Sequence, residues 1–129
     1  MNNKNAKLAL LLVRLAAAGN MLIHGITRLS LGTVSNFDGY LSSIGFPPYT
    51  AWVLTIFELA GAISIIIGRW VTPIALIFCL ELLMGIILVH FHEGWFVVGA
   101  GRNGMEYSVL LIICFISTAL VSWKRNLMR

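Results

Sequence analysis

The chain contains four long apolar stretches, and these constrain its fold more than any other feature. They occupy residues 8–29, 50–68, 71–91 and 105–123. A helix needs about 20 residues to cross the hydrocarbon core of a bilayer. A segment inside lipid must satisfy its own backbone hydrogen bonds, which favours helices, and these stretches lack the alternation of barrel strands. We therefore predict an all-α membrane protein, a four-transmembrane-helix bundle in which residues 1–129 form a single domain.

The composition also indicates a protein that is surrounded by lipid rather than by water. Of the 129 residues, 59% are hydrophobic and 11% are charged, whereas a soluble domain has about 25% charged residues. Polar residues are too few to coat a soluble globule, and the same numbers exclude a disordered chain, a fibrous chain and a nucleic-acid-binding domain. Cys79 and Cys114 lie inside apolar stretches and form no CxxC motif. We therefore expect buried free thiols rather than a redox pair or a zinc site.

The first apolar stretch has an alternative interpretation as a cleaved signal peptide, because Lys4 and Lys7 precede it and three consecutive alanines lie within it. Arg14, however, limits its uninterrupted apolar part to residues 8–13, which is shorter than the usual hydrophobic region of a signal peptide. The stretch also continues well beyond the alanines. We therefore expect a retained transmembrane helix.

Basic residues predict the orientation in the membrane. An even number of spans places both tails and the link between the second and third spans on one side, which the positive-inside rule makes cytoplasmic. The basic residues on that side are Lys4, Lys7, Arg69, Lys124, Arg125 and Arg129. Aromatic residues are expected at both interfaces, with Trp70 and Trp123 on the inner side and Tyr49, Trp52, Trp95 and Tyr107 on the outer side. Both termini are therefore predicted to be cytoplasmic.

The first outer loop contains a helical pattern. Apolar residues recur at the spacing of one helix face, namely Phe37, Tyr40, Leu41 and Ile44. Ser35 and Asp38 resemble the capping box of a helix start, and Gly45 with Pro47 is typical of a helix stop. We predict a short amphipathic helix at residues 36–44 that lies on the outer surface of the bundle. The alternative is an irregular loop with scattered aromatic residues.

Ionisable residues inside the spans are the most informative side chains, because an unpaired charge at mid-membrane costs a few kcal/mol. They are Arg14, His24, Arg28, Glu58, Glu81, His90 and Glu106. On the first helix, the residues of one polar stripe fall within an arc of about 120°. That stripe consists of Arg14, Ala17, Asn20, His24 and Arg28. We therefore expect it to face neighbouring helices.

Depth along the helices, at about 1.5 Å per residue, predicts where these groups meet. Most of them fall in the outer half of the bundle, where we expect one polar pocket or network. Its members are Asn20, His24, Arg28, Glu58, His90, Glu106 and Tyr107. Arg14 and Glu81 lie nearer the inner end and form a predicted second buried pair.

Several functions could use such a pocket. Arg28 would neutralise Glu58 and Glu106, and His24 beside Glu58 could exchange protons near neutral pH, which makes His24 and Glu58 the candidate catalytic residues. The alternative is a structural polar network that sets the order of the helices. A metal site is not expected, because no HExxH motif is present and Arg28 would repel a cation.

The order of these motifs resembles the DoxX family of small bacterial integral membrane proteins. The matching pieces are Leu12-Val13-Arg14-Leu15, His24-Gly25 with Arg28, Phe37-Asp38-Gly39-Tyr40-Leu41 before Gly45-Phe46-Pro47, Phe57-Glu58-Leu59-Ala60-Gly61, Val89-His90, and Gly104-Met105-Glu106-Tyr107. The similarity covers residues 8–122. The family positions that coincide with the buried polar set are Arg14, His24, Arg28, Glu58, His90 and Glu106.

The resemblance implies a four-helix fold in the bacterial inner membrane. Relatives include membrane subunits of thiosulfate:quinone oxidoreductases and proteins linked with oxidative stress. We therefore expect a redox-linked membrane subunit or accessory protein, whose partners are the lipid bilayer, a redox-enzyme subunit or a second copy of the chain. The alternatives are a small membrane enzyme or proton-handling unit that binds a lipophilic ligand such as a quinone, and a pure interaction or assembly module. No flavin, haem or quinone motif is recognisable.

Overall fold

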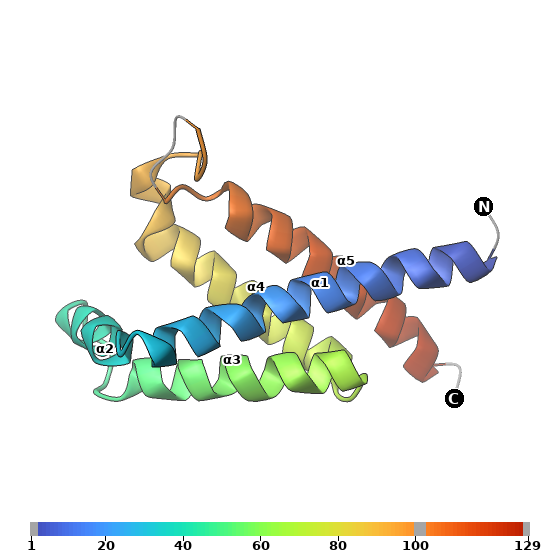
Figure 1. The fold of residues 1–129 in the computed structure, drawn as a ribbon, viewed down its shortest axis with the longest axis horizontal. Helices are drawn as coiled ribbons and strands as arrows, with labels where there is room; N and C mark the ends of the chain where they lie inside the picture. Colours follow the sequence, from blue (N-terminus) through green and yellow to red (C-terminus); the bar gives the residue numbers. More distant parts are fainter. Residues whose placement is uncertain (1–2, 100–102, 128–129) are drawn as a thin grey trace. The chain divides into compact units, whose positions relative to one another are not determined.

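The computed structural model describes residues 3–99 and 103–127, and every regular element in these residues is helical. The elements are α1 (Asn3–Ser30), α2 (Val34–Ser43), α3 (Thr50–Ile67), α4 (Val71–Leu88), the 3-10 helix η1 (His90–Glu93) and α5 (Glu106–Leu127). Figure 1 shows them in chain order. The prediction of an all-helical chain with four long helices and one short helix is confirmed.

The four long helices are each long and apolar enough to cross a bilayer. In the most apolar 18-residue segment of each helix, at most 33% of the residues are buried inside the protein. Most of the apolar side chains are therefore exposed on the protein surface and require an apolar solvent around them. Leu80 in the middle of α4, for example, is 60% exposed. Lipid is the solvent that satisfies this pattern, and the chain is a multi-pass membrane protein.

The helix ends differ from the predicted ones where local geometry overrides the apolar pattern. α1 begins at Asn3, because the polar residues before the apolar stretch continue the same helix, and α5 extends to Leu127. α4 ends at Leu88 rather than at residue 91, because Val89 leaves the helical conformation and the chain turns into η1. Gly68 ends α3 in the left-handed conformation, with φ 82°, which a glycine adopts without steric cost.

Two compact units divide the chain. Ala18–Arg69, here called the middle unit, contains the second half of α1 together with α2 and α3. Met1–Ala17 with Trp70–Arg129, here called the terminal unit, contains the first half of α1 together with α4, η1 and α5.

In the terminal unit, α4 and α5 pack side by side in antiparallel directions. The rings of Phe78 and Phe115 are 5.2 Å apart between centroids. The hydroxyl of Thr72 donates to the carbonyl of Ala119 at 3.4 Å. Thr72 precedes Phe78 on α4, whereas its partner Ala119 follows Phe115 on α5, so the two helices run in opposite directions. Ala75, which is fully buried, lies one turn after Thr72 on the same helix face, and small residues on such a face are typical of membrane helix pairs.

Both cysteines lie in this unit and are free thiols. Cys79 and Cys114 are half-buried rather than fully buried. The thiol of Cys79 lies 3.7 Å from the carbonyl oxygen of Ile112 on the facing helix, so it contributes a weak polar contact to the α4–α5 interface.

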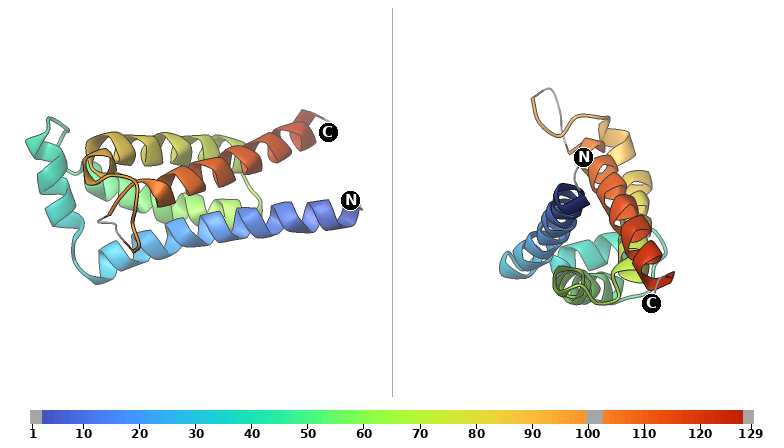
Figure 2. Two further views of the ribbon diagram at one scale, coloured as in Figure 1. Left: turned by 90° about the horizontal axis from the view of Figure 1, so that it is seen from above. Right: turned by 90° about the vertical axis from the view of Figure 1, so that its right-hand side faces the viewer.

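In the middle unit, α2 packs against the start of α3 and lies across its end rather than along it (Figure 2). Val34 and Leu41 of α2 form a buried cluster with Ala51 of α3, and partly buried apolar side chains surround it. Those side chains are Phe37, Phe46 and Leu54. The apolar face predicted for this helix is therefore used, in part, to hold α2 on α3.

The predicted capping box of α2 is wrong. The helix begins at Val34 after an N-cap at Thr33 that makes no side-chain capping bond. The carboxylate of Asp38 instead accepts hydrogen bonds from the backbone N–H groups of Tyr49 at 2.9 Å and Ala51 at 3.0 Å. Asp38 thus caps the N-terminus of α3, where unpaired N–H groups and the helix dipole favour a carboxylate.

Candidate functional site

The centre of the candidate site is an ion pair between α1 and α3 in the middle unit. Nη1 of Arg28 lies 2.9 Å from Oε2 of Glu58, and Nη2 of Arg28 donates to Oε1 of Glu58 at 3.2 Å. The side chains are only 14% and 4% exposed, respectively. A two-point pair of this kind matches the planar guanidinium to the planar carboxylate and sets both distance and orientation.

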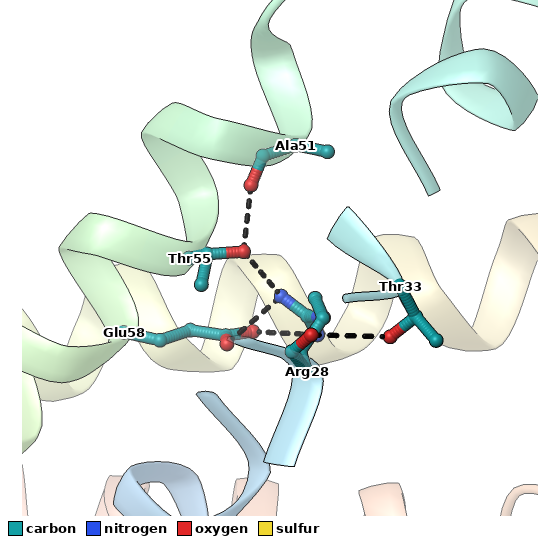
Figure 3. A network of polar contacts seen from close by, with 5 residues as sticks. All are labelled: Arg28, Thr33, Ala51, Thr55 and Glu58. Atoms are coloured by element: carbon teal, nitrogen blue, oxygen red, sulfur yellow. Dashed lines mark hydrogen bonds and ion pairs between the residues drawn. The ribbon is translucent and has the colours of Figure 1, made fainter. Parts of the chain in front are cut away.

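A threonine on α3 extends this pair. Thr55 is fully buried, and its hydroxyl accepts a hydrogen bond from Nη1 of Arg28 at 3.0 Å while it donates to the carbonyl of Ala51 at 2.7 Å. Figure 3 shows the resulting chain of polar contacts from Glu58 through Arg28 and Thr55 to the α3 backbone. Because the hydroxyl donates to the backbone, its oxygen is oriented to accept from the cation.

The short helix α2 also contacts the cation. The guanidinium carbon of Arg28 lies 4.8 Å from the centre of the Phe37 ring, which is within the range of a cation–π interaction. The hydroxyl of Thr33, just before α2, donates to the backbone carbonyl of Arg28 at 3.3 Å. The site is therefore assembled from all three helices of the middle unit.

A glycine allows α1 to approach α3 near this site. A Cβ atom at Gly25 would lie 3.0 Å from Cδ2 of Leu59 and 3.5 Å from Oε2 of Glu58. Any larger side chain at this position would displace Leu59 or the carboxylate. Gly25 is thus required for the close packing around the ion pair and contributes no functional side chain to the site.

The electrostatic consequence is a neutral pair inside the span region. Two separated charges would be costly there, whereas a hydrogen-bonded pair at contact distance offsets most of that cost. Within the part of the chain that the structure describes, Arg28 uses three of its five N–H donors, two for Glu58 and one for Thr55. The other two donors can orient an oxygen atom of a bound group or of a partner helix.

The other predicted members of the outer pocket have different surroundings. His24 lies one turn before Arg28 on α1 and is exposed, and Asn20 is half-buried one turn earlier. His90 and Glu106 lie in the terminal unit, where Nδ1 of His90 is 2.8 Å from the carbonyl oxygen of Asn103. Arg28 belongs to the middle unit, and the predicted bridge from Arg28 to Glu106 stays a prediction.

Glu106 has a defined role within its own unit. Its carboxylate accepts hydrogen bonds from the backbone N–H groups of Val97 at 2.8 Å and Val98 at 3.3 Å. These bonds tie the segment after η1 to the first residue of α5. Tyr107, the next residue, is 48% exposed.

The predicted second pair lies in the terminal unit. Arg14 on α1 and Glu81 on α4 are both half-buried. The Nε atom of Arg14 is buried and has no hydrogen-bond partner among the described residues. The contact between the two side chains stays a prediction. Within the described ranges, no group of three or more His, Cys, Asp or Glu side chains is placed to hold a metal ion.

Sequence reasoning missed three contributors to the site. Thr55 and Phe37 contact Arg28, and Gly25 makes room for the pair. The signal for Thr55 was available, because it precedes Glu58 by three residues and therefore shares its helix face. The contact with Phe37 depends on how α2 folds back, which periodicity does not indicate.

The DoxX family model matches residues 9–91, which include both members of the ion pair. A protein of Bacillus subtilis (strain 168) named "Putative oxidoreductase CatD" is 27% identical to this chain over 120 residues, which represent 92% of this chain and 82% of that protein. No solved structure matches the chain significantly.

Proposed function

The chain belongs to the DoxX family of membrane proteins, and from that membership we propose that it is a membrane subunit of, or an accessory protein to, an oxidoreductase of the bacterial inner membrane. The observation that carries the proposal is the Arg28–Glu58 pair, a nearly buried ion pair between two helices that are long and apolar enough to span a membrane. Ionisable residues within membrane spans are functional candidates by default, because their insertion is costly. The name of the Bacillus subtilis relative supplies the class of reaction.

Within that role, the middle unit would present Arg28 to a redox partner or to the polar end of a lipophilic substrate. Glu58 and Thr55 hold the guanidinium in one orientation, and the remaining donors would bind an oxygen atom. His24 lies one turn away on the same helix and is the candidate for proton exchange.

The proposed role in an oxidoreductase can be tested by purifying the tagged protein from its native membranes in a mild detergent. The wild-type chain is expected to retain an oxidoreductase subunit or a redox-active small molecule, identified by native mass spectrometry and an absorbance spectrum. Deletion of the protein should lower the electron-transfer activity of the membranes. A protein that purifies alone and without a ligand, from membranes whose activity does not depend on it, contradicts the proposal.

Variants separate a functional from a structural role of the pair. Glu58→Gln, which keeps an acceptor, and Arg28→Lys, which keeps the positive charge, are expected to reduce the activity of the membranes per amount of folded protein. Glu93→Gln alters an exposed carboxylate just beyond α4 and serves as the matched control. Loss of folded protein in parallel with activity would instead assign the pair to architecture alone.

The proposed orientation places both termini in the cytoplasm and α2 at the outer interface. The basic residues of the tails and of the link at Arg69 support it, and α2 lies across the end of α3, as a helix at a membrane surface does. In a Cys79→Ser, Cys114→Ser background, Asn36→Cys should react with a membrane-impermeant maleimide added to intact cells. Arg69→Cys should react only after permeabilisation, and the reverse pattern refutes this topology.

A further inference from the structure

The segment that runs from within η1 toward α5 exposes large apolar side chains although its backbone is held by hydrogen bonds. Residues 91–98, here called the aromatic loop, contain four such side chains. They are Phe91, Trp95, Phe96 and Val98, with 63%, 47%, 52% and 72% exposure, respectively. In Figure 1, η1 and the segment after it lie beyond the ends of α4 and α5. This surface is distinct from the ion pair of the middle unit.

The backbone of the loop is paired with the start of α5. Glu106 donates its N–H to the carbonyl of Trp95 at 2.9 Å, and Gly104 donates to that of Phe96 at 3.1 Å. The carboxylate of Glu106 accepts from the N–H groups of Val97 and Val98. Polar backbone groups that would otherwise require water are thus satisfied inside the protein, which is the condition for entering a weakly polar medium.

Close packing holds this arrangement in place. A Cβ atom at Gly104 would lie 2.5 Å from the carbonyl oxygen atoms of Trp95 and Phe96. Only glycine therefore lets the chain just before α5 approach residues 95–96 this closely. The apolar side chains are therefore presented outward by a constrained backbone and do not fold back onto α4 or α5.

The position of the loop identifies the medium. α4 has 18 residues and spans about 27 Å at 1.5 Å per residue, close to the thickness of the hydrocarbon core at about 30 Å. α4 ends and α5 begins at the same end of their antiparallel pair, so the aromatic loop falls at the level of the lipid headgroups. Tryptophan is enriched at that level because its ring is apolar and its N–H is polar.

We propose that the aromatic loop is a membrane-interface anchor, in which the four exposed side chains insert among the lipid headgroups and upper acyl chains beside α4 and α5. Glu106 and Gly104 hold the loop in the conformation that presents them. His92 and Glu93, which are exposed within the same segment, remain in contact with water. The occupant of this surface is lipid, and a protein partner is the competing outcome.

The test measures the fluorescence of Trp95 in liposomes. A chain with Trp52→Phe, Trp70→Phe and Trp123→Phe keeps a single tryptophan, and phosphatidylcholine brominated either near the headgroup or near the acyl-chain end quenches it according to depth. We expect the shallow bromines to quench Trp95 about twofold more than the deep ones, as for an interfacial residue. Iodide in the water should quench it little.

Two further chains keep the test decisive. Leu80→Trp, made in a background without other tryptophans, places the probe in the middle of α4 and should show the opposite preference, for deep bromines. If the triple variant does not fold, the difference in quenching between the wild-type chain and Trp95→Phe gives the same information from one substitution. Strong iodide quenching with no bromine effect overturns the proposal. Shielding of Trp95 that appears only when native membrane proteins are added also overturns it and assigns the surface to a protein partner.

Discussion

Removal of one member of the Arg28–Glu58 pair should cost far more than removal of both. Glu58→Met eliminates both bonds to the carboxylate, at 2.9 and 3.2 Å, and leaves a guanidinium that is 14% exposed without its counter-charge. Breaking a buried pair in this way costs about 3–5 kcal/mol. Interhelical hydrogen bonds in membranes average only about 0.6 kcal/mol, so we expect the lower end, about 3 kcal/mol, with a similar cost for Arg28→Met.

The double variant Arg28→Met with Glu58→Met leaves no unpaired charge. Thr55 keeps its bond to the carbonyl of Ala51, so the new apolar contact should come within about 2 kcal/mol of the wild-type stability. The two single costs therefore should not add: two costs of about 3 kcal/mol and a double cost of at most about 2 kcal/mol correspond to a coupling energy of at least about 4 kcal/mol.

The assay is unfolding of the purified protein in mixed micelles by increasing sodium dodecyl sulfate, followed by circular dichroism. The free energy of unfolding is compared among the wild-type chain, the two single variants and the double variant. The matched control is Glu93→Met, which alters a carboxylate that is exposed outside the spans and should leave the free energy nearly unchanged. If the double variant costs the sum of the two single variants, the ion pair does not stabilise the middle unit and the reasoning fails.

Three other perturbations test single contacts. Gly25→Ala should be destabilising by about 1–3 kcal/mol because its Cβ would crowd the facing helix. The control Gly19→Ala has open space around the new methyl group and should stabilise α1 by up to about 1 kcal/mol. Equal effects of the two substitutions in the same micelle assay would contradict the close approach of α1 to α3. Asp38→Ala should cost about 1 kcal/mol and speed hydrogen exchange of the first amides of α3, and an unchanged exchange rate rejects the capping role. Glu106→Ala should speed exchange of the two amides that its carboxylate binds, while Glu106→Gln, which keeps a carbonyl acceptor, should do so less; equal rates in both variants would show that the side chain does not hold the loop.

The number and type of the long helices could be predicted from the sequence with little ambiguity. Crossing a bilayer requires length and apolarity along one segment, and both are properties of consecutive residues. The link at Gly68 could be placed for the same reason, because a left-handed helix end depends on one residue and its neighbours. Helix ends were less predictable where polar residues continued a helix, as at Asn3.

Only the two charged members of the candidate site could be predicted from the sequence. Burial of a charge demands a partner, so Arg28 and Glu58 could be selected from their types and depths, and the structure places them in contact. Thr55 and Phe37 complete the site. The helix face that Thr55 shares with Glu58 does not by itself require a contact with Arg28, and the contact of Phe37 depends on how α2 folds back.

Asp38 and Glu106 show where local pattern reasoning ends. The sequence predicts a capping box for Asp38, which is wrong, and a place in the outer polar pocket for Glu106, which stays a prediction. In the structure Asp38 binds the first amides of α3, and Glu106 binds the loop after η1. Each acceptor bonds to a segment about 8 to 13 residues away in the chain, and that distance is closed by a turn whose path is set by packing.

The sequence by itself thus determined the solvent of this protein, its four spans, its family resemblance and the buried charges that required partners, because each follows from residue type and position along the chain. The tertiary structure alone decided which groups pair. A hydrogen bond is made or lost over a few tenths of an ångström, and that distance depends on how α2 crosses the end of α3 and how the aromatic loop returns to α5, which are outcomes of three-dimensional packing.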